Sequence, residues 1–200
     1  FSSARESALS GRIGGPASSQ AAPAGKRRLL VLGGSGGATA LNQSVPRALY
    51  RIRKQLEGWT IHHQTGPDEA EAAAGLYRRF GLSALVEPFI DDMPAAMAAA
   101  ELALCRSGGS TLAELAVTET PAVLVPYPEA ADDHQRRNAE WFAEAGAARV
   151  VDQRRTAARL DVHLAAAVAE ILSDRPLRDG MAAVMRRVAR PRAAETIAGL

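Results

Sequence analysis

Short apolar runs alternate with longer amphipathic segments along most of the chain, and this rhythm constrains the fold more than any other feature. The run at 28–33 (RLLVLG) leads into glycines, and the run at 121–126 (PAVLVP) is wholly apolar, as in strands that are buried on both faces. Strand–helix alternation predicts a parallel sheet with helices on both faces. We therefore expect an α/β fold, a doubly wound, Rossmann-like domain. The six expected strands lie at 28–33, 59–64, 84–89, 101–105, 121–126 and 147–152.

The segments between these runs have helical spacing, with apolar residues three or four positions apart. In 38–56 they include Leu41, Val45 and Leu49. Pro46 lies inside this segment and predicts a kink or a restart of the helix. Further helices are expected at 68–80, 92–100, 110–118, 133–145, 160–172 and 175–189.

Composition suggests where the folded domain begins. Residues 1–26 are rich in Ser, Gly, Ala and Pro, which is typical of a flexible lead-in or an interdomain linker. Their basic charge leaves a membrane-surface contact as the alternative. We expect one domain over 27–192 and a C-terminal tail over 193–200. The first residues lack the pattern of a signal peptide, and no apolar run is long enough to predict a membrane span.

Charge and cysteine content exclude several classes of protein. Lys and Arg number 24 and Asp and Glu 22, so the net charge of +2 is too small to favour nucleic acid as the main partner. The single cysteine, Cys105, excludes an internal disulfide and suits a reducing compartment. The spacing of His62, His63 and His134 is unconvincing for metal ligands, so we expect no metal. His62 or His63, at the end of a strand, could act as a general base, although a structural role is the commoner one.

Ligands of doubly wound sheets bind at the carboxyl ends of the strands, which makes the loops after the strands informative. The first such loop reads GGSGG over 33–37. Its glycines would let the backbone approach a phosphate at the helix N-terminus, and a tight turn without a ligand is the alternative. Thr39 replaces the last glycine of a dinucleotide motif, and the strand at 59–64 ends in His-His-Gln instead of an acidic residue. The Gly-Lys-Ser/Thr of a P-loop is also absent.

The second loop, CRSGGST over 105–111, repeats this pattern. Ser110 or Thr111 could cap the following helix or donate to a phosphate oxygen. Glu114, about one turn into the helix, could accept two hydrogen bonds from a ribose diol, because a carboxylate has two acceptor oxygens. Alternatively, Ser110 is the N-cap and Glu114 merely lies near the helix N-terminus.

The third loop runs from Pro126 to the sequence DDHQ at 132–135. His134, Gln135 and, one turn later, Asn138 carry donors and acceptors that suit sugar hydroxyls. Asp132 and Asp133 could instead be simple helix-start residues.

Three segments together resemble one family. They are LLVLGGSGGATALNQSVPRAL at 29–49, VEPFIDDMPAAMAAAELALCRSGGSTLAELA at 86–116 and TPAVLVPYPEAADDHQRRNAEWFAEAGAARVV at 120–151. In order and spacing they are similar to the MurG family of GT-B glycosyltransferases, and the resemblance covers about 27–190. It implies that the chain is one half of a GT-B enzyme, namely the C-terminal domain, which binds the UDP-GlcNAc donor.

The resemblance also implies roles for individual residues. Ser35 would contact the diphosphate, Ile90 would recognise uracil through its backbone, and Glu114 would bind the ribose hydroxyls. His134, where some relatives carry glutamine, and Gln135 would bind the GlcNAc hydroxyls. The full implied set for UDP-GlcNAc is Ser35, Gly36, Ile90, Gly109, Ser110, Thr111, Leu112, Ala113, Glu114, His134 and Gln135.

The implied reaction is the inverting transfer of GlcNAc to a lipid-linked muramyl-pentapeptide acceptor in peptidoglycan synthesis. It needs no metal or cofactor and takes place at the cytoplasmic face of the bacterial inner membrane, through a peripheral contact. The acceptor and the catalytic base belong to an N-terminal domain that these residues do not resemble. The base is therefore unknown, and we expect the chain alone to be inactive. The alternatives are another GT-B transferase that uses a UDP-sugar and a non-catalytic paralogue that binds nucleotide sugars.

Overall fold

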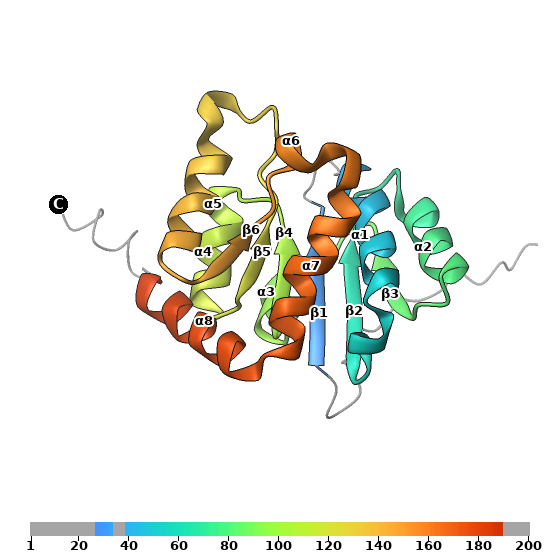
Figure 1. The fold of residues 1–200 in the computed structure, drawn as a ribbon, viewed down its shortest axis with the longest axis horizontal. Coiled ribbons are helices and arrows are strands. Elements are labelled where there is room, and N and C mark those ends of the chain that lie inside the picture. Colours follow the sequence, from blue (N-terminus) through green and yellow to red (C-terminus); the bar gives the residue numbers. More distant parts are fainter. Residues whose placement is uncertain (1–26, 34–38, 190–200) are drawn as a thin grey trace, which may run out of the picture.

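A computed structural model describes residues 27–33 and 39–189, which form a single parallel sheet flanked by helices (Figure 1). The strand order is β3-β2-β1-β4-β5-β6, and every neighbouring pair is parallel. This arrangement confirms the predicted doubly wound, Rossmann-like fold. The strands are β1 (Arg27–Leu32), β2 (Trp59–Gln64), β3 (Ala84–Glu87), β4 (Leu102–Cys105), β5 (Ala122–Leu124) and β6 (Ala148–Val150).

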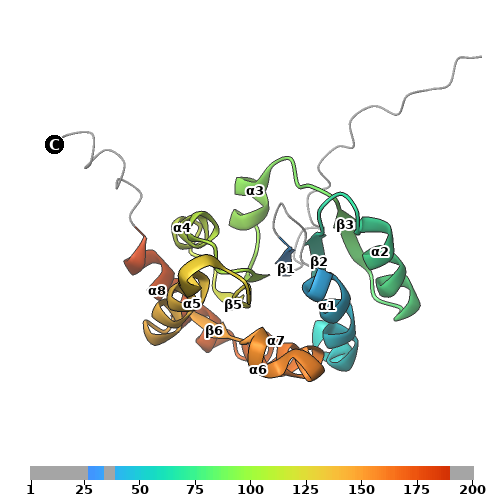
Figure 2. The same ribbon diagram turned by 90° about the horizontal axis from the view of Figure 1, so that it is seen from above.

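Helices cover both faces of the sheet (Figure 2). The helices α1 (Thr39–Arg51), α2 (Ala70–Arg79) and α7 (Leu160–Ser173) lie on one face. On the other face lie α3 (Met93–Ala98), α4 (Gly109–Val117) and α5 (His134–Glu144). The last helix, α8 (Arg175–Val188), contacts both α4 and α7. The short elements are η1 (Arg53–Leu56), η2 (Ala131–Asp133), α6 (Gln153–Thr156) and η3 (Ala157–Arg159).

The central strand divides the core into two layers, because successive side chains of a strand point to opposite faces. Leu29 and Val31 of β1 belong to the cluster beneath α1 and α7. Leu30 and Leu32 belong to the cluster beneath α3 and α4. All four are at most 5% exposed, so β1 is buried on both faces, as its apolar sequence predicts.

Two expectations for regular structure need correction. The helix α1 continues through Pro46 as one element, so the restart that we named beside a kink is absent, while the kink stays a prediction. Leu41, Val45 and Leu49, before and after this position, are fully buried, and their packing holds both parts of the helix against the sheet. Strands predicted at 84–89 and 121–126 are shorter than expected, because the chain turns into the following loops after Glu87 and Leu124.

The strand order places a topological switch point between β1 and β4. The chain leaves β1 toward α1 on one face and leaves β4 toward α4 on the other. The two loops diverge at the carboxyl ends of the strands, which is where ligands bind in such sheets. The predicted lead-in at 1–26 and tail at 193–200 lie outside the described residues, and the domain limits of 27–192 stay a prediction.

Candidate functional site

The N-terminus of α4 opens directly at the switch point. Gly108, with φ −66° and ψ 144°, is its N-cap, and the helix begins at Gly109 without a side-chain cap from the described residues. The alternative that Ser110 is the N-cap is therefore wrong. Gly109 and Ser110 are exposed, so the first-turn N–H groups and the Ser110 hydroxyl face solvent, as a phosphate site requires.

The next residues of α4 divide between the surface and the core. Ala113 and Glu114 are exposed, and Thr111 is half-buried. Leu112 is 2% exposed and belongs to the core, so its side chain cannot contact a ligand at the surface. Glu114 thus presents an exposed carboxylate about one turn beyond the helix N-terminus.

Ile90 lies between β3 and α3, and its backbone already has a partner. Its N–H donates to Gln64 Oε1 over 3.0 Å, and Gln64 is buried at the end of β2. A base that Ile90 recognises must therefore use the carbonyl oxygen or share the N–H with Gln64. Sequence reasoning missed Gln64, although its position at the carboxyl end of a strand could have pointed to it.

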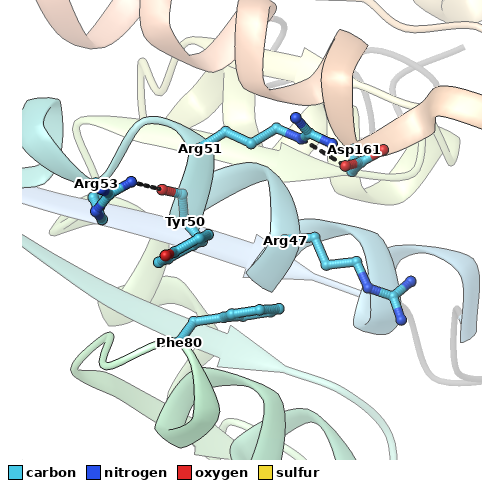
Figure 3. A pocket seen from close by; sticks show the side chains of 6 residues that line it. All are labelled: Arg47, Tyr50, Arg51, Arg53, Phe80 and Asp161. Carbon is cyan, nitrogen blue, oxygen red and sulfur yellow. Dashed lines mark hydrogen bonds and ion pairs between the residues drawn. The ribbon is translucent and has the colours of Figure 1, made fainter.

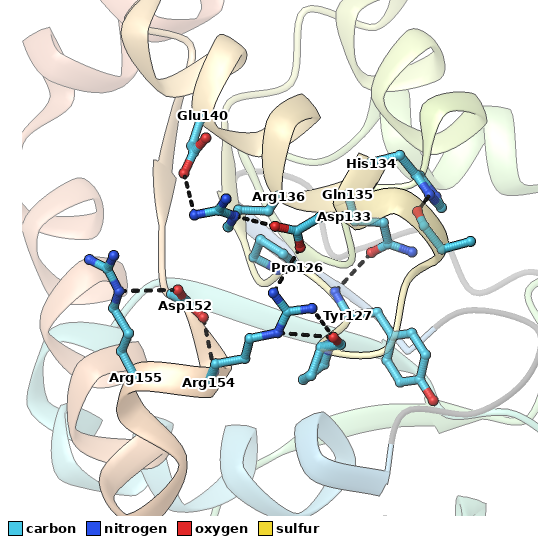
Figure 4. A network of polar contacts seen from close by, with 12 residues as sticks. Pro126, Tyr127, Asp133, His134, Gln135, Arg136, Glu140, Asp152, Arg154 and Arg155 are labelled. Carbon is cyan, nitrogen blue, oxygen red and sulfur yellow. Dashed lines mark hydrogen bonds and ion pairs between the residues drawn. The ribbon is translucent and has the colours of Figure 1, made fainter.

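The third loop orients its two predicted sugar-binding side chains (Figure 4). Gln135 Oε1 accepts a hydrogen bond of 3.0 Å from the Tyr127 N–H, which leaves the amide NH₂ as the outward donor. His134 Nδ1 lies 2.6 Å from the Ala131 carbonyl oxygen and must donate to it, since a carbonyl only accepts. In a neutral ring, Nε2 is then an acceptor. The pair offers one donor and one acceptor to a sugar.

The second and third loops are bonded to each other. Ser107 Oγ donates to the Gln135 carbonyl over 2.7 Å, and Asn138 Nδ2 donates to the Ser107 carbonyl over 3.2 Å. Asn138, a candidate for binding sugar hydroxyls, thus has a structural bond to the loop after β4. Asp133 is the N-cap of α5 and Asp132 lies in η2 just before it, so both stand at the helix start, as the alternative expected; both also have left-handed φ angles, of 50° and 55°.

Arg106, to which the sequence assigned no contact, braces the same region. Its Nη1 donates to the carbonyls of Val125 and Pro126, over 3.1 and 3.2 Å, and to Gln153 Oε1 over 2.8 Å. Its guanidinium lies 5.4 Å from the ring centroid of Tyr127. Burial lowers the pKa of Arg106 from its ordinary value. An arginine directly after a buried strand is the sequence signal that could have indicated this role.

The two histidines of β2 have structural surroundings. His63 is fully buried, with Nδ1 3.0 Å from the Tyr77 hydroxyl and Nε2 3.1 Å from Asn42 Oδ1. Burial, and next the neighbouring His62, lower the pKa of His63 to about 3. His62 Nε2 lies 2.5 Å from Glu87 Oε2. His63 is therefore a core residue, in agreement with the commoner of the two roles considered.

A cavity of about 480 Å³ lies elsewhere on the molecule (Figure 3). The rings of Tyr50 and Phe80 stack there with centroids 5.0 Å apart, and Arg51 Nε pairs with Asp161 over 2.6 Å. These residues lie outside the loops that follow the strands, so we do not assign the cavity to the candidate site. Its lining is Arg47, Tyr50, Arg51, Arg53, Phe80 and Asp161.

Other features can be stated only for the described ranges. Within 27–33 and 39–189, no three His, Cys, Asp or Glu side chains are grouped as a metal site would require. No helix in that part of the chain has the length and apolar character to cross a membrane. Ser35 and Gly36, predicted to contact a diphosphate, lie outside the described residues.

The parallel strand order and the open N-terminus of α4 at the switch point define a doubly wound α/β domain. Residues 28–196 match the model of the glycosyltransferase family 28 C-terminal domain. The chain therefore belongs to glycosyltransferase family 28.

Curated relatives carry one common name. The chain is 47% identical over 86% of its length to a UDP-N-acetylglucosamine–N-acetylmuramyl-(pentapeptide) pyrophosphoryl-undecaprenol N-acetylglucosamine transferase of Methylococcus capsulatus. It is 43% identical over 88% of its length to the enzyme of that name from Pseudomonas fluorescens. These matches cover 47% and 48% of the relatives, so the chain spans about half the length of the curated relatives it matches.

Solved structures agree on the architecture. The crystal structure of Acinetobacter baumannii MurG superposes with a TM-score of 0.76 at 37% identity, covering 90% of this chain and 50% of that one. The lipopolysaccharide glycosyltransferase WaaG superposes with a TM-score of 0.63 at 18% identity, over 88% of this chain and 47% of its own, which shows a common fold alone. The predicted fold class, one half of a GT-B glycosyltransferase, is confirmed.

Proposed function

We propose that this chain is the donor-binding half of an enzyme that transfers N-acetylglucosamine from UDP-GlcNAc to a lipid-linked muramyl-pentapeptide. The observation that carries the proposal is the exposed N-terminus of α4 at the switch point, with the Glu114 carboxylate one turn beyond it. The shared name of the curated relatives supports the choice of UDP-GlcNAc among nucleotide sugars.

The proposed donor site assigns one chemical task to each loop. The first-turn N–H groups of α4, from Gly109 to Thr111, bind the diphosphate, and Ser35 and Gly36 contact it from the loop after β1. Glu114 binds the ribose hydroxyls, and the Ile90 backbone recognises uracil. His134 and Gln135 bind the hydroxyls of GlcNAc, as acceptor and donor respectively.

These tasks suggest how the domain would assist the reaction. As the sugar–phosphate bond breaks, negative charge grows on the leaving diphosphate. The positive end of the α4 dipole and its first-turn N–H groups, which bond to no other described residue, stabilise that charge without moving, because the helix is already in place. The chain's own share of catalysis is thus stabilisation of the leaving group and orientation of the sugar.

The remaining parts of the proposal concern the whole enzyme. We assign the acceptor to the other half of a GT-B enzyme, and we name no catalytic base among these residues. The place of action that we propose is the cytoplasmic face of the bacterial inner membrane, through a peripheral contact. The named activity of relatives that are about twice as long supports both assignments.

Titration calorimetry of the chain with UDP, UDP-GlcNAc, UDP-GalNAc and UDP-glucose tests the donor site. We expect saturable binding of UDP and a preference for UDP-GlcNAc among the sugars. Glu114→Gln keeps the shape but removes the charge, and should weaken UDP and UDP-GlcNAc binding by roughly tenfold, the value of one hydrogen bond to a charged group.

The matched control is Glu144→Gln. Glu144 is an exposed glutamate at the C-terminal end of α5, away from His134 and Gln135, and the variant should bind both ligands like the wild type. If a folded sample binds neither UDP nor UDP-GlcNAc, the proposal is wrong. A preference for UDP-glucose would instead favour another GT-B transferase.

A further inference from the structure

The segment between β5 and α5 has an unusual backbone. Asp132 and Asp133 are consecutive and have φ angles of 50° and 55°, in the left-handed region that residues other than glycine rarely adopt. This turn stands immediately before His134 and Gln135, the two residues proposed to bind the sugar. A conformation that is unfavourable for two successive residues persists only where the surroundings hold it.

Arg154, from a different part of the chain, makes the contacts that stabilise this turn (Figure 4). It belongs to α6, about twenty positions after the turn. Its Nε donates to the Pro128 carbonyl over 2.9 Å, its Nη2 donates to the same oxygen, and its Nη1 donates to Asp133 Oδ1 over 2.9 Å. The Arg154 guanidinium therefore bonds to the segment between β5 and α5 at two points, at Pro128 near its beginning and at Asp133 at its end.

The other carboxylate oxygen of Asp133 is also bonded. Arg136 Nε, one turn into α5, donates to Asp133 Oδ2 over 2.5 Å. A carboxylate that receives both guanidiniums cannot turn without breaking an ion pair, so the backbone of Asp133 is fixed together with its side chain. Arg154 itself is oriented by the N-cap of α6, where Asp152 Oδ1 accepts from the Arg154 N–H over 2.9 Å.

We infer that Arg154 is a positioning residue for recognition of the donor's sugar, acting through the 128–133 segment on His134 and Gln135. The inference rests on the proposed function. Arg154 holds the turn from which His134 and Gln135 follow at the start of α5, each oriented by a bond to the loop before it. The nucleotide does not depend on it, because its proposed contacts lie on α4, in the loop after β1 and at Ile90, and none of them lies in the 128–133 segment.

The test compares the affinities of the whole chain for UDP and for UDP-GlcNAc. In Arg154→Ala we expect UDP-GlcNAc to bind about three- to tenfold more weakly, while UDP binds as it does to the wild type. Arg154→Lys keeps the charge but cannot bond Pro128 and Asp133 in the same planar fork, and should fall in between.

Arg155→Ala is the matched control, because this neighbouring side chain is 81% exposed and its ion pair within the described part of the chain, to Asp152, is a long one of 3.5 Å. It should leave both affinities unchanged. Thermal unfolding of each variant identifies samples that fail to fold. If Arg154→Ala does not fold, the ratio of the UDP-GlcNAc and UDP affinities is measured for Arg154→Lys instead, and that ratio decides the test.

Two results would overturn the inference. In one, the folded Arg154 variants bind UDP-GlcNAc relative to UDP with the same ratio of affinities as the wild type. In the other, the variants bind UDP and UDP-GlcNAc more weakly by the same factor. A wild-type chain that binds no UDP would instead contradict the proposed function, so the two failures can be told apart.

Discussion

Ser107 Oγ donates a hydrogen bond of 2.7 Å to the backbone carbonyl of Gln135, and this contact joins the loop after β4 to the first turn of α5. Asn138 Nδ2 returns a bond of 3.2 Å to the Ser107 carbonyl. Ser107 is fully buried, whereas Gln135 and Asn138 are half-buried, so the two bonds lie where the core meets the surface. The proposed phosphate-binding and sugar-binding loops therefore form one connected unit.

Replacing Ser107 with alanine should loosen this unit. We expect Ser107→Ala to lower the free energy of unfolding by about 1 kcal/mol, because the half-buried Gln135 carbonyl loses its donor. Urea denaturation measures the change. Ser83→Ala, at an exposed position between α2 and β3, serves as the control and should stay within about 0.5 kcal/mol of the wild type. Equal stabilities of the two variants would show that the Ser107 bond contributes nothing.

The buried His63 predicts a dependence of stability on pH. Its pKa in the folded protein is lowered from 6.5 to about 3. Between these two pH values the unfolded chain therefore binds a proton at His63 and the folded chain does not. Stability from this residue is complete above about pH 6.5 and is lost as the pH falls toward 3. The slope cannot exceed about 1.4 kcal/mol per pH unit.

The measurement is the free energy of unfolding at pH 7 and pH 5, for the wild type and for His63→Gln. Glutamine takes up no proton in this range, so the difference between the two pH values should shrink in the variant. Taking the difference within each protein cancels the overall cost of the substitution. An unchanged difference would mean that His63 is not held neutral by its surroundings.

Arg178 predicts a large effect on stability far from the site. It is 4% exposed, and its Nη1 donates to the carbonyls of Ile171 and Leu172 at the end of α7, over 2.8 and 2.9 Å. Its guanidinium lies 5.2 Å from the ring centroid of Trp59. Arg178→Met should cost about 3 kcal/mol of unfolding free energy, since the carbonyls lose a charged donor.

Arg175→Met provides the comparison in the same helix. Arg175 is 82% exposed and has one ion pair of 3.6 Å, to Asp179, which is of little value at the surface. Thermal unfolding should show a clear fall in midpoint for Arg178→Met and almost none for Arg175→Met. Similar midpoints would contradict the role of Arg178 as the cap of α7.

The limits of sequence reasoning at the site are visible in single residues. The cap of α4 is Gly108 and not Ser110, because the backbone path out of β4 decides where the helix begins. Asn138 and Gln135 have partners in the loop after β4, about thirty positions earlier, which no local pattern reveals. Arg154 lies on a four-residue helix that the sequence did not predict.

By itself, the sequence determined the α/β class and the positions of the six strands, and it predicted β2 with the bounds that the structure has. Periodicity suffices for this, because a side chain's burial repeats with the geometry of its own strand or helix. The strand order, and with it the switch point between β1 and β4, came only from the tertiary structure. The contacts of Ser107, Arg106 and Arg154 did so as well, because hydrogen bonds between distant segments depend on how whole elements pack.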